Sequence, residues 1–124
     1  MTHPEKTILI VEDNIDFHTL TKLMLLQHGF RIKSLFDGKL AAVYAMLATC
    51  DVILLDVDLP SGSGAEICKK LKDDPDTCDI PIIMMTGNAE AESICVKAGA
   101  DACLTKPFAS SALLGKIQDT LIAR

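Results

Sequence analysis

Short apolar runs that alternate with helical patterns constrain the fold of this chain more than any other feature. Three runs are rich in Ile, Val and Leu: Thr7–Val11, Val52–Leu55 and Ile80–Met85. Such runs are typical of strands that are buried on both faces of a parallel sheet. Two further runs, Arg31–Phe36 and Ala102–Thr105, mix polar with apolar residues, so we expect them at the two edges of the sheet.

Between the runs, apolar side chains recur three and four positions apart, which is the spacing of amphipathic helices. The residues that define these patterns are Leu20, Leu23 and Met24; Leu40, Val43, Tyr44 and Leu47; Ile67, Lys70 and Leu71; Ala91, Ile94, Cys95 and Ala98; and Leu113, Leu114, Ile117, Leu121 and Ile122. The chain therefore repeats a strand–helix unit five times.

A (βα)5 chain of 124 residues is too short to close an eight-stranded barrel. We therefore expect an α/β fold, an open and doubly wound parallel sheet with helices on both faces and the flavodoxin-like strand order 2-1-3-4-5. We expect one domain over residues 1–124, with a core that spans residues 7–122. In this order the first and third strands are neighbours, and ligands bind beyond their carboxyl ends.

Glycine and asparagine residues mark the expected helix ends. Gly29 and Gly99 lie where a helix should give way to a strand, and glycine takes the left-handed conformation there without a steric penalty. Asn14 and Asn88 come directly before helical patterns, so we expect each of them to cap the N-terminus of a helix.

Charge and composition exclude several classes of function. The net charge of −5 argues against direct binding of nucleic acid, which depends on clustered Lys and Arg. The chain has neither a membrane-spanning apolar run nor a signal-peptide segment, so we expect a cytoplasmic protein with no membrane insertion and a protein partner. Its five cysteines are odd in number and lack C-x-x-C spacing, so we expect apolar fillers rather than a disulfide framework or a zinc site.

Three carboxylates follow two strands that the expected fold makes neighbours. Glu12 and Asp13 follow the first strand, and Asp56 follows the third. Two negative charges about 4 Å apart repel by about 4 kcal/mol at an effective dielectric constant of about 20, so stability alone does not explain this convergence. A hard divalent cation does, and Mg²⁺ (or Mn²⁺) suits a site of one or two carboxylates that also holds water and phosphate oxygens.

The other strand ends carry groups that suit phosphoryl transfer. Thr86 and Gly87, a hydroxyl beside a small residue, follow the fourth strand, and Lys106 and Pro107 follow the fifth. The Lys106 ammonium can offset the negative charge that develops during transfer. The strand ends together therefore offer a nucleophile, metal ligands, a hydroxyl and a cation, which is the set that phosphoryl transfer needs.

Four motifs closely resemble those of the response-regulator receiver family of two-component signalling, in the same order and across nearly the whole chain. They read I-L-I-V-E-D-N, V-I-L-L-D-V-D-L-P-S-G-S-G-A-E, P-I-I-M-M-T-G and G-A-D-A-C-L-T-K-P-F. The chain is similar to the chemotaxis-type, single-domain receivers. The resemblance implies a phosphorelay protein that accepts a phosphoryl group on Asp56 as an aspartyl phosphate.

The resemblance also implies how the site would be built. Mg²⁺ would be held by Asp13, by Asp56 and by the backbone carbonyl of Asp58, and Glu12 would act through water. Thr86 would bond a phosphoryl oxygen and move toward it on activation.

The remaining roles follow from the same resemblance. Lys106 would pair with the phosphoryl group and with the acceptor carboxylate, and Gly87 would keep the approach clear. The peptide bond between Lys106 and Pro107 would be cis. Asp58 and Asn88 would flank the path of the attacking water and so tune the lifetime of the phosphate.

Two positions depart from the family pattern. Cys103 stands three positions before Lys106, where most receivers carry a Tyr or Phe ring that rotates on activation. We expect activation to be signalled by loop and helix shifts without a ring, or to be weakly coupled. Ser63 precedes Gly64 where the family often has Asp; this small and polar segment from Ser61 is either a mobile loop or, as we favour, a plain turn into a helix.

The partners implied are a histidine kinase or a histidine phosphotransfer protein as donor, and a downstream protein as target. The last helical pattern ends close to Arg124, so we expect no effector domain. The family suggests that the fourth helix, fifth strand and fifth helix carry the output contact, a face that includes Lys97, Cys103, Ser110, Ser111 and Lys116. We expect a monomer or a weak, phosphorylation-dependent dimer.

Three other readings remain open. The Asp56-Val57-Asp58 segment resembles the D-x-D of haloacid-dehalogenase-type phosphatases, although that family does not explain Glu12 and Asp13. A flavodoxin-like module for a cofactor phosphate should have N–H donors after its first strand, where this chain has two acids. A pseudo-receiver would keep the fold and lose the chemistry. We expect no enzyme activity beyond self-phosphorylation and autodephosphorylation.

Overall fold

The computed structural model describes residues 6–39, 43–44, 50–59 and 62–122. Its five-stranded parallel sheet has the order β2-β1-β3-β6-β7, which confirms the predicted order 2-1-3-4-5. The strands are β1 (Thr7–Val11), β2 (Arg31–Leu35), β3 (Val52–Asp56), β6 (Ile82–Thr86) and β7 (Ala102–Thr105). The two runs of mixed polarity form the edge strands, as predicted.

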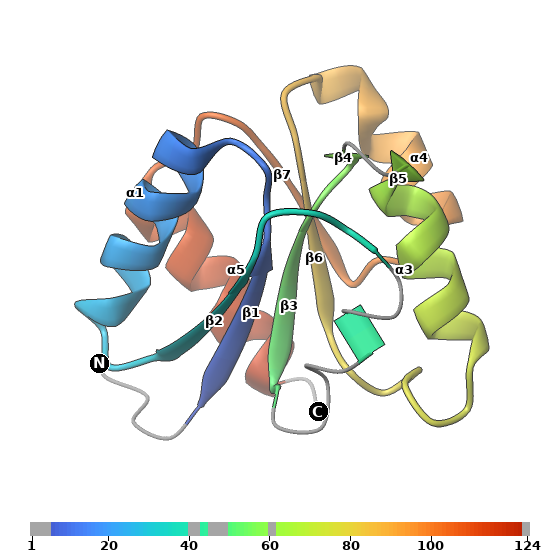
Figure 1. The fold of residues 1–124 in the computed structure, drawn as a ribbon, viewed down its shortest axis with the longest axis horizontal. Helices are drawn as coiled ribbons and strands as arrows, with labels where there is room; N and C mark the ends of the chain where they lie inside the picture. Colours follow the sequence, from blue (N-terminus) through green and yellow to red (C-terminus); the bar gives the residue numbers. More distant parts are fainter. Residues whose placement is uncertain (1–5, 40–42, 45–49, 60–61, 123–124) are drawn as a thin grey trace.

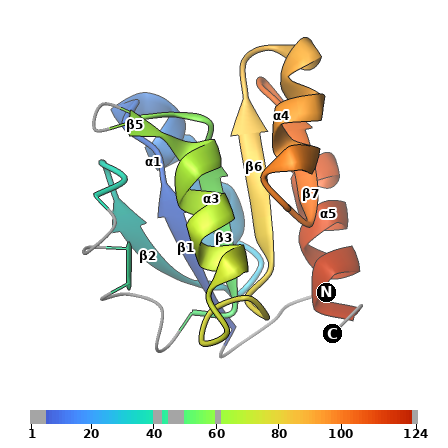
Figure 2. The ribbon, with the colours of Figure 1, turned by 90° about the vertical axis from the view of Figure 1, so that its right-hand side faces the viewer.

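Helices cover both faces of the sheet, as Figures 1 and 2 show. The helices α1 (Ile15–Leu26) and α5 (Ser110–Ile122) lie on one face, and α3 (Gly64–Asp73) and α4 (Glu92–Lys97) lie on the other. A short 3₁₀ helix, η2 (Ala89–Ala91), precedes α4, and a two-stranded ribbon of β4 (Asp58–Leu59) and β5 (Gly62–Ser63) follows β3. No helix in the described ranges is long and apolar enough to span a membrane.

The second helical pattern is only partly described. Val43 and Tyr44 are helical, and Val43 is buried in the core beside α3. Leu40 and Leu47 of the same pattern lie outside the described residues.

The core consists of two apolar clusters separated by the sheet. All five residues of β1, β3 and β6 are buried. One cluster packs the sheet against α3 and α4, and the other packs it against α1 and α5. The central strands are therefore apolar on both faces because each face is covered.

The apolar pattern of the first helix does not mark the face that is buried. Leu20 and Leu23 are 52% and 53% exposed, whereas His18, Thr21 and Leu25 face the sheet. Apolar side chains lie on both sides of α1, so their spacing does not decide which side docks. Ile94 of α4, which belongs to the apolar pattern of its helix, is likewise 46% exposed.

The predicted helix ends are confirmed. Gly29 and Gly99 have φ values of 86° and 84°, which glycine adopts without strain. The side chain of Asn14 accepts a hydrogen bond from the Phe17 N–H at 2.9 Å, and that of Asn88 accepts one from the Glu90 N–H at 2.9 Å. These caps fix where α1 and η2 begin, next to the carboxyl ends of β1 and β6.

The turn after Asp56 is tightly packed. Ser63 caps α3 by accepting from the Ala65 N–H at 3.1 Å, and Gly62 and Ser63 pair with β4. Ser61 lies outside the described residues, and the choice between a mobile loop and a plain turn stays a prediction. A Cβ atom on Gly64 would clash with the backbone carbonyl oxygen of Asp56. Gly64 is therefore required for the close approach of this turn to the strand.

We predict that Gly64→Ala lowers the free energy of unfolding by about 2–4 kcal/mol, because the backbone at Asp56 cannot yield without disturbing β3. Gly115→Ala is the matched control, since a Cβ there meets nothing within 4 Å, and a helical Ala should stabilise α5 by about 0.5–1 kcal/mol. Urea denaturation of both variants measures the difference. Equal stability of the two variants would contradict the prediction.

Candidate functional site

The register of the sheet brings the acidic residues together. Val11 pairs with Leu55, so Glu12 continues β1 at the level of Asp56, the last residue of β3. Carboxylate oxygens of Glu12, Asp13 and Asp56 all lie within 4.8 Å of one another. Glu12 is 1% and Asp56 5% exposed, whereas Asp13 is exposed to solvent.

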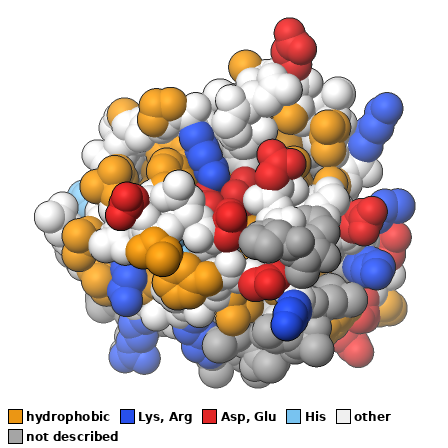
Figure 3. All heavy atoms as spheres, turned by 45° about the horizontal axis from the view of Figure 1, so that its top comes forward, with side chains coloured by type: hydrophobic (Ala, Val, Ile, Leu, Met, Phe, Trp, Pro, Cys, Tyr) orange, Lys and Arg blue, Asp and Glu red, His pale blue; other side chains and the backbone are white. Residues whose placement is uncertain are grey.

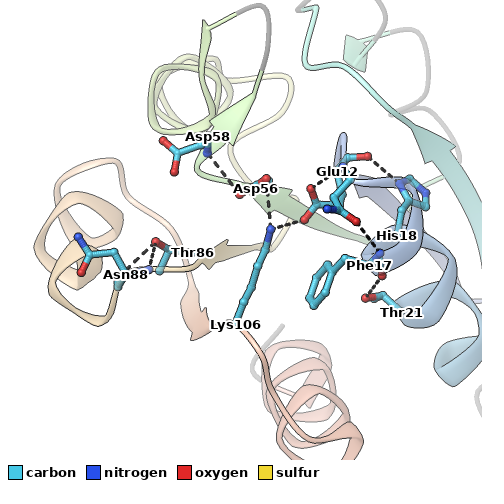
Figure 4. Close-up of polar contacts among 10 residues, drawn as sticks. Glu12, Phe17, His18, Thr21, Asp56, Asp58, Thr86, Asn88 and Lys106 are labelled. Carbon is cyan, nitrogen blue, oxygen red and sulfur yellow. Dashed lines mark hydrogen bonds and ion pairs between the residues drawn. The ribbon is translucent and has the colours of Figure 1, made fainter.

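Lys106 reaches this acidic cluster from the segment after β7. Its Nζ forms ion pairs with Glu12 Oε1 and with Asp56 Oδ2, the latter at 3.3 Å (Figure 4). Its backbone N–H donates to the Thr86 carbonyl at 2.7 Å, which ties the segment to β6. The ammonium also lies 4.7 Å from the centroid of the Phe17 ring, a cation–π contact that fixes its direction.

The Lys106–Pro107 peptide bond is cis, as the resemblance implied. Phe108, the next residue, packs edge-on against Phe17 of α1, with ring centroids 5.4 Å apart. The segment that carries Lys106 is therefore held from two sides, by β6 and by α1.

Glu12 is positioned by Asn14, which caps α1, and by His18 within α1, which was not among the predicted site residues. Its Oε2 accepts from the Asn14 N–H at 3.1 Å. Its backbone carbonyl lies 2.8 Å from His18 Nδ1, which acts as the donor because the carbonyl can only accept. The buried His18 ring also stacks on Phe36, with centroids 4.2 Å apart. One feature of the sequence could have indicated His18: it lies one helical turn after the Asn14 cap, which places it near the end of β1.

Burial and charge move the pKa values of the two buried acids in opposite directions. Burial raises the pKa of Glu12, but hydrogen bonds from Lys106 and from the Asn14 N–H outweigh it, so the net shift is downward. Burial and the neighbouring Glu12 raise the pKa of Asp56 to about 6, against the pull of Lys106 and the Asp58 N–H. One ammonium thus neutralises one carboxylate, and the second remains costly to ionise.

We predict that the cost of ionising Asp56 makes the stability of the folded chain depend on pH when no divalent cation is present. Because the folded pKa of Asp56 is about 6 and its ordinary value is 3.8, the folded chain binds more protons between these values. The contribution of Asp56 to stability therefore falls as pH rises through this window. Near neutral pH, Asp56→Asn should raise the free energy of unfolding by roughly 1–3 kcal/mol.

Urea denaturation at about pH 4 and about pH 7 checks this prediction. Asp119→Asn, an exposed acid on α5, serves as control and should shift stability by less than about 0.5 kcal/mol. Added Mg²⁺ should stabilise the wild type more than Asp56→Asn. A gain for Asp56→Asn that is as large at acid pH as at neutral pH would exclude the ionisation of Asp56 as its cause.

Thr86 ends β6 with a buried hydroxyl, 2% exposed. Its Oγ1 accepts from the Asn88 N–H at 3.1 Å and donates to the Asn88 carbonyl at 3.3 Å (Figure 4). The hydroxyl is thus engaged with the loop that leads to η2 and α4. A Cβ on Gly87 would meet nothing within 4 Å, so the space beside this residue is open.

The remaining predicted residues lie around this centre. The Asp58 N–H donates to Asp56 Oδ1 at 3.3 Å, and the Asp58 side chain is exposed. A metal-ligand role for the Asp58 carbonyl stays a prediction. Cys103 lies on β7, half-buried, with its sulfur 2.7 Å from that of Cys95.

The donor set fits a hard divalent cation. Its ligands are carboxylate oxygens, which Mg²⁺ and Mn²⁺ prefer. Three carboxylates face the single Lys106 ammonium, and burial together with the neighbouring Glu12 raises the pKa of Asp56. Figure 3 shows acidic side chains gathered in a depression at the carboxyl ends of the strands, where a cation can enter from solvent. Glu12, Asp13 and Asp56 are the residues that could hold it.

Comparisons with known proteins point to one family of domains. The family model described as "Response regulator receiver domain" matches residues 8–118. The phosphate regulon transcriptional regulatory protein PhoB of Pseudomonas aeruginosa is 35% identical over 118 residues, which are 94% of this chain and 52% of that protein. The chain spans about half the length of the curated relatives it matches.

Two solved structures are similar over almost their whole length. Chemotaxis response regulator CheY4 of Vibrio cholerae has a TM-score of 0.83 and 30% identity, with 94% of this chain and 98% of that chain covered. The receiver domain of sensor histidine kinase PA1611 from Pseudomonas aeruginosa has a TM-score of 0.84 and 30% identity, covering 94% and 97%. That structure has a magnesium ion coordinated in its active site cleft.

Proposed function

The chain belongs to the response regulator receiver domain family, and we propose that it accepts a phosphoryl group on Asp56 from a histidine kinase or a histidine phosphotransfer protein. The observation that carries the proposal is the setting of Asp56: a carboxylate at the end of β3, 5% exposed, between an acid pair and the Lys106 ammonium. Beyond self-phosphorylation and autodephosphorylation, the chain is a switch rather than an enzyme.

The transfer step requires an ionised Asp56. One carboxylate oxygen forms the new bond to phosphorus, while the bond from phosphorus to the donor nitrogen breaks and that nitrogen keeps the electron pair. Glu12, Asp13 and Asp56 would hold Mg²⁺, which neutralises charge on the carboxylates and on the phosphoryl oxygens. Lys106 is already 3.3 Å from Asp56 and stabilises the charge that develops on the transferred group.

We predict that acetyl phosphate with Mg²⁺ adds one phosphoryl group to the wild type and none to Asp56→Asn. Intact-mass spectrometry measures the adduct, and Asp119→Asn, which changes an exposed acid of α5, should still be labelled. Addition that survives Asp56→Asn would overturn the assignment. Absence of any adduct would favour a pseudo-receiver. Turnover of p-nitrophenyl phosphate far beyond one equivalent would favour a D-x-D phosphatase.

We propose that Thr86 carries the response to α4 without a rotating ring. Its hydroxyl holds the backbone of Asn88, and Asn88 caps η2 directly before α4. A phosphoryl oxygen on Asp56 would compete for this hydroxyl. Both bonds to Asn88 would then break, and the loop before α4 would be free to shift.

We predict that beryllofluoride, a stand-in for the phosphoryl group, shifts the amide resonances of η2 and α4 in the wild type. In Thr86→Ala these shifts should fall to less than about half, because no hydroxyl couples the site to the loop. Cys103→Tyr, which restores the ring of the family, should keep or enlarge them. Amide shifts recorded with and without beryllofluoride measure all three. Unchanged α4 resonances in the wild type would exclude this route.

We propose that the donor protein contacts the outward face of α1. Ile15 is 68% exposed and begins the helix directly after the acidic segment, and Leu23 and Leu26 are 53% and 45% exposed. Exposed apolar side chains beside a reactive group suit a transient protein contact. The output partner would use the other end of the sheet, around α4, β7 and α5, where Val96 is 70% exposed.

We predict that Ile15→Lys slows phosphoryl transfer from a phosphotransfer protein by about tenfold or more. In the complex, a charge would replace an apolar contact that binding buries and that is worth about 1.5 kcal/mol. Labelling by acetyl phosphate needs no protein contact and should be unchanged. Val96→Lys on α4 is the matched control, because it makes the same change far from α1. If Ile15→Lys slowed labelling by acetyl phosphate as much as transfer from the protein, Ile15 would affect the transfer step itself and not the binding of the donor protein.

A further inference from the structure

Two cysteines lie side by side between α4 and the edge strand β7. The sulfur atoms of Cys95 and Cys103 are 2.7 Å apart. A disulfide has about 2.05 Å between its sulfurs, so the pair needs only a small closing movement. Cys95 is 1% exposed and faces the core, whereas Cys103 is half-buried.

The other three cysteines have different partners. Cys50, Cys68 and Cys78 each donate to a backbone carbonyl, at 3.0, 3.4 and 3.7 Å. Cys95 and Cys103 are the pair of described cysteines whose thiols bond each other. A tetrahedral zinc site needs three or four ligands, and within the described ranges no third His, Cys, Asp or Glu joins these two sulfurs.

The pair is reachable by a small oxidant. A hollow of about 230 Å³ is lined by both cysteines, together with Glu92 and Val96 of α4 and Lys116 of α5. Cys103 is the more exposed of the two residues, so its thiol would react first. Burial raises the pKa of Cys95 to about 12, so this thiol stays protonated at neutral pH and is the slower of the two to react with an oxidant.

We propose that Cys95 and Cys103 are a redox modification site, which hydrogen peroxide converts into a reversible disulfide that ties α4 to β7. The Cys103 sulfur attacks the peroxide, the O–O bond breaks, and a sulfenic acid and one water form. The Cys95 sulfur then attacks the sulfenic sulfur, and its proton leaves with the hydroxide as a second water. The two thiols together lose two electrons to the peroxide, and an external dithiol reverses the change.

The disulfide would restrain the element that the response moves. α4 carries Cys95, and the loop before α4 is the segment that Thr86 holds. This consequence rests on the proposed phosphorylation of Asp56, whereas the disulfide chemistry does not. Oxidation would then uncouple α4 from the state of Asp56 while leaving the acceptor itself reactive.

The chemistry is tested by treating the folded chain with hydrogen peroxide, alkylating it after denaturation without reductant, and mapping peptides by mass spectrometry. Two of the five cysteines should resist alkylation, and the peptides that contain Cys95 and Cys103 should be linked. Dithiothreitol should restore five free thiols. Cys103→Ala, at a half-buried position, and Cys95→Ala should both lose the link, and Cys78→Ala should keep it.

Several outcomes overturn the proposal. They are five alkylated cysteines after treatment, a link that uses Cys78 between two chains, or Cys103 oxidised to a sulfinic acid with Cys95 still free.

The proposed restraint of α4 by the disulfide is tested by the amide shifts that beryllofluoride causes in α4. These shifts should shrink in the oxidised chain and return with dithiothreitol. Undiminished shifts in the oxidised chain would overturn that consequence. Absence of labelling at Asp56 would refute the proposed function alone, because the peptide map does not depend on it.

Discussion

The site depends on one cation held among buried carboxylates. Lys106 neutralises Glu12 and contacts Asp56, both of which lie almost fully out of solvent. Removing one partner of a buried ion pair typically costs about 3–5 kcal/mol, because the other charge is left uncompensated. The packing of Phe17 and Phe108, which directs the Lys106 side chain, therefore serves the charge balance as well as the core.

Lys106 does not neutralise all of the negative charge at the site, and the proposed function depends on the charge that remains. Lys106 offsets the charge of Glu12, whereas burial and the neighbouring Glu12 keep the pKa of Asp56 raised, so Asp56 gains from an added cation. The buried Thr86 hydroxyl, held by Asn88, links the same centre to α4. Where the family has a ring on the last strand, Cys103 instead contacts α4 through Cys95, so the output face would respond to oxidation as well as to phosphorylation.

The strands and the central site residues could be predicted, because each has a local signature. Strands buried on both faces must be apolar throughout, and the carboxyl ends of parallel strands meet at one edge of a sheet. The buried face of α1 could not be predicted, since Leu20 and Leu23 are as apolar as Leu25 and only docking decides which side is covered. His18 was missed for the same reason: its bond to the Glu12 carbonyl exists only once α1 packs beside β1.

The sequence by itself determined the alternation of strands and helices, the strand order, and which residue types stand at the strand ends. It did so because periodicity, caps and motifs are properties of neighbouring residues, and because a short (βα)5 chain has few ways to cover both faces of its sheet. Only the tertiary structure decided that Lys106 reaches Glu12 from 94 positions away, that Gly64 must lack a side chain against Asp56, and that Cys95 meets Cys103. Such contacts form between separate elements, so their distances and pKa shifts depend on packing that no local pattern records.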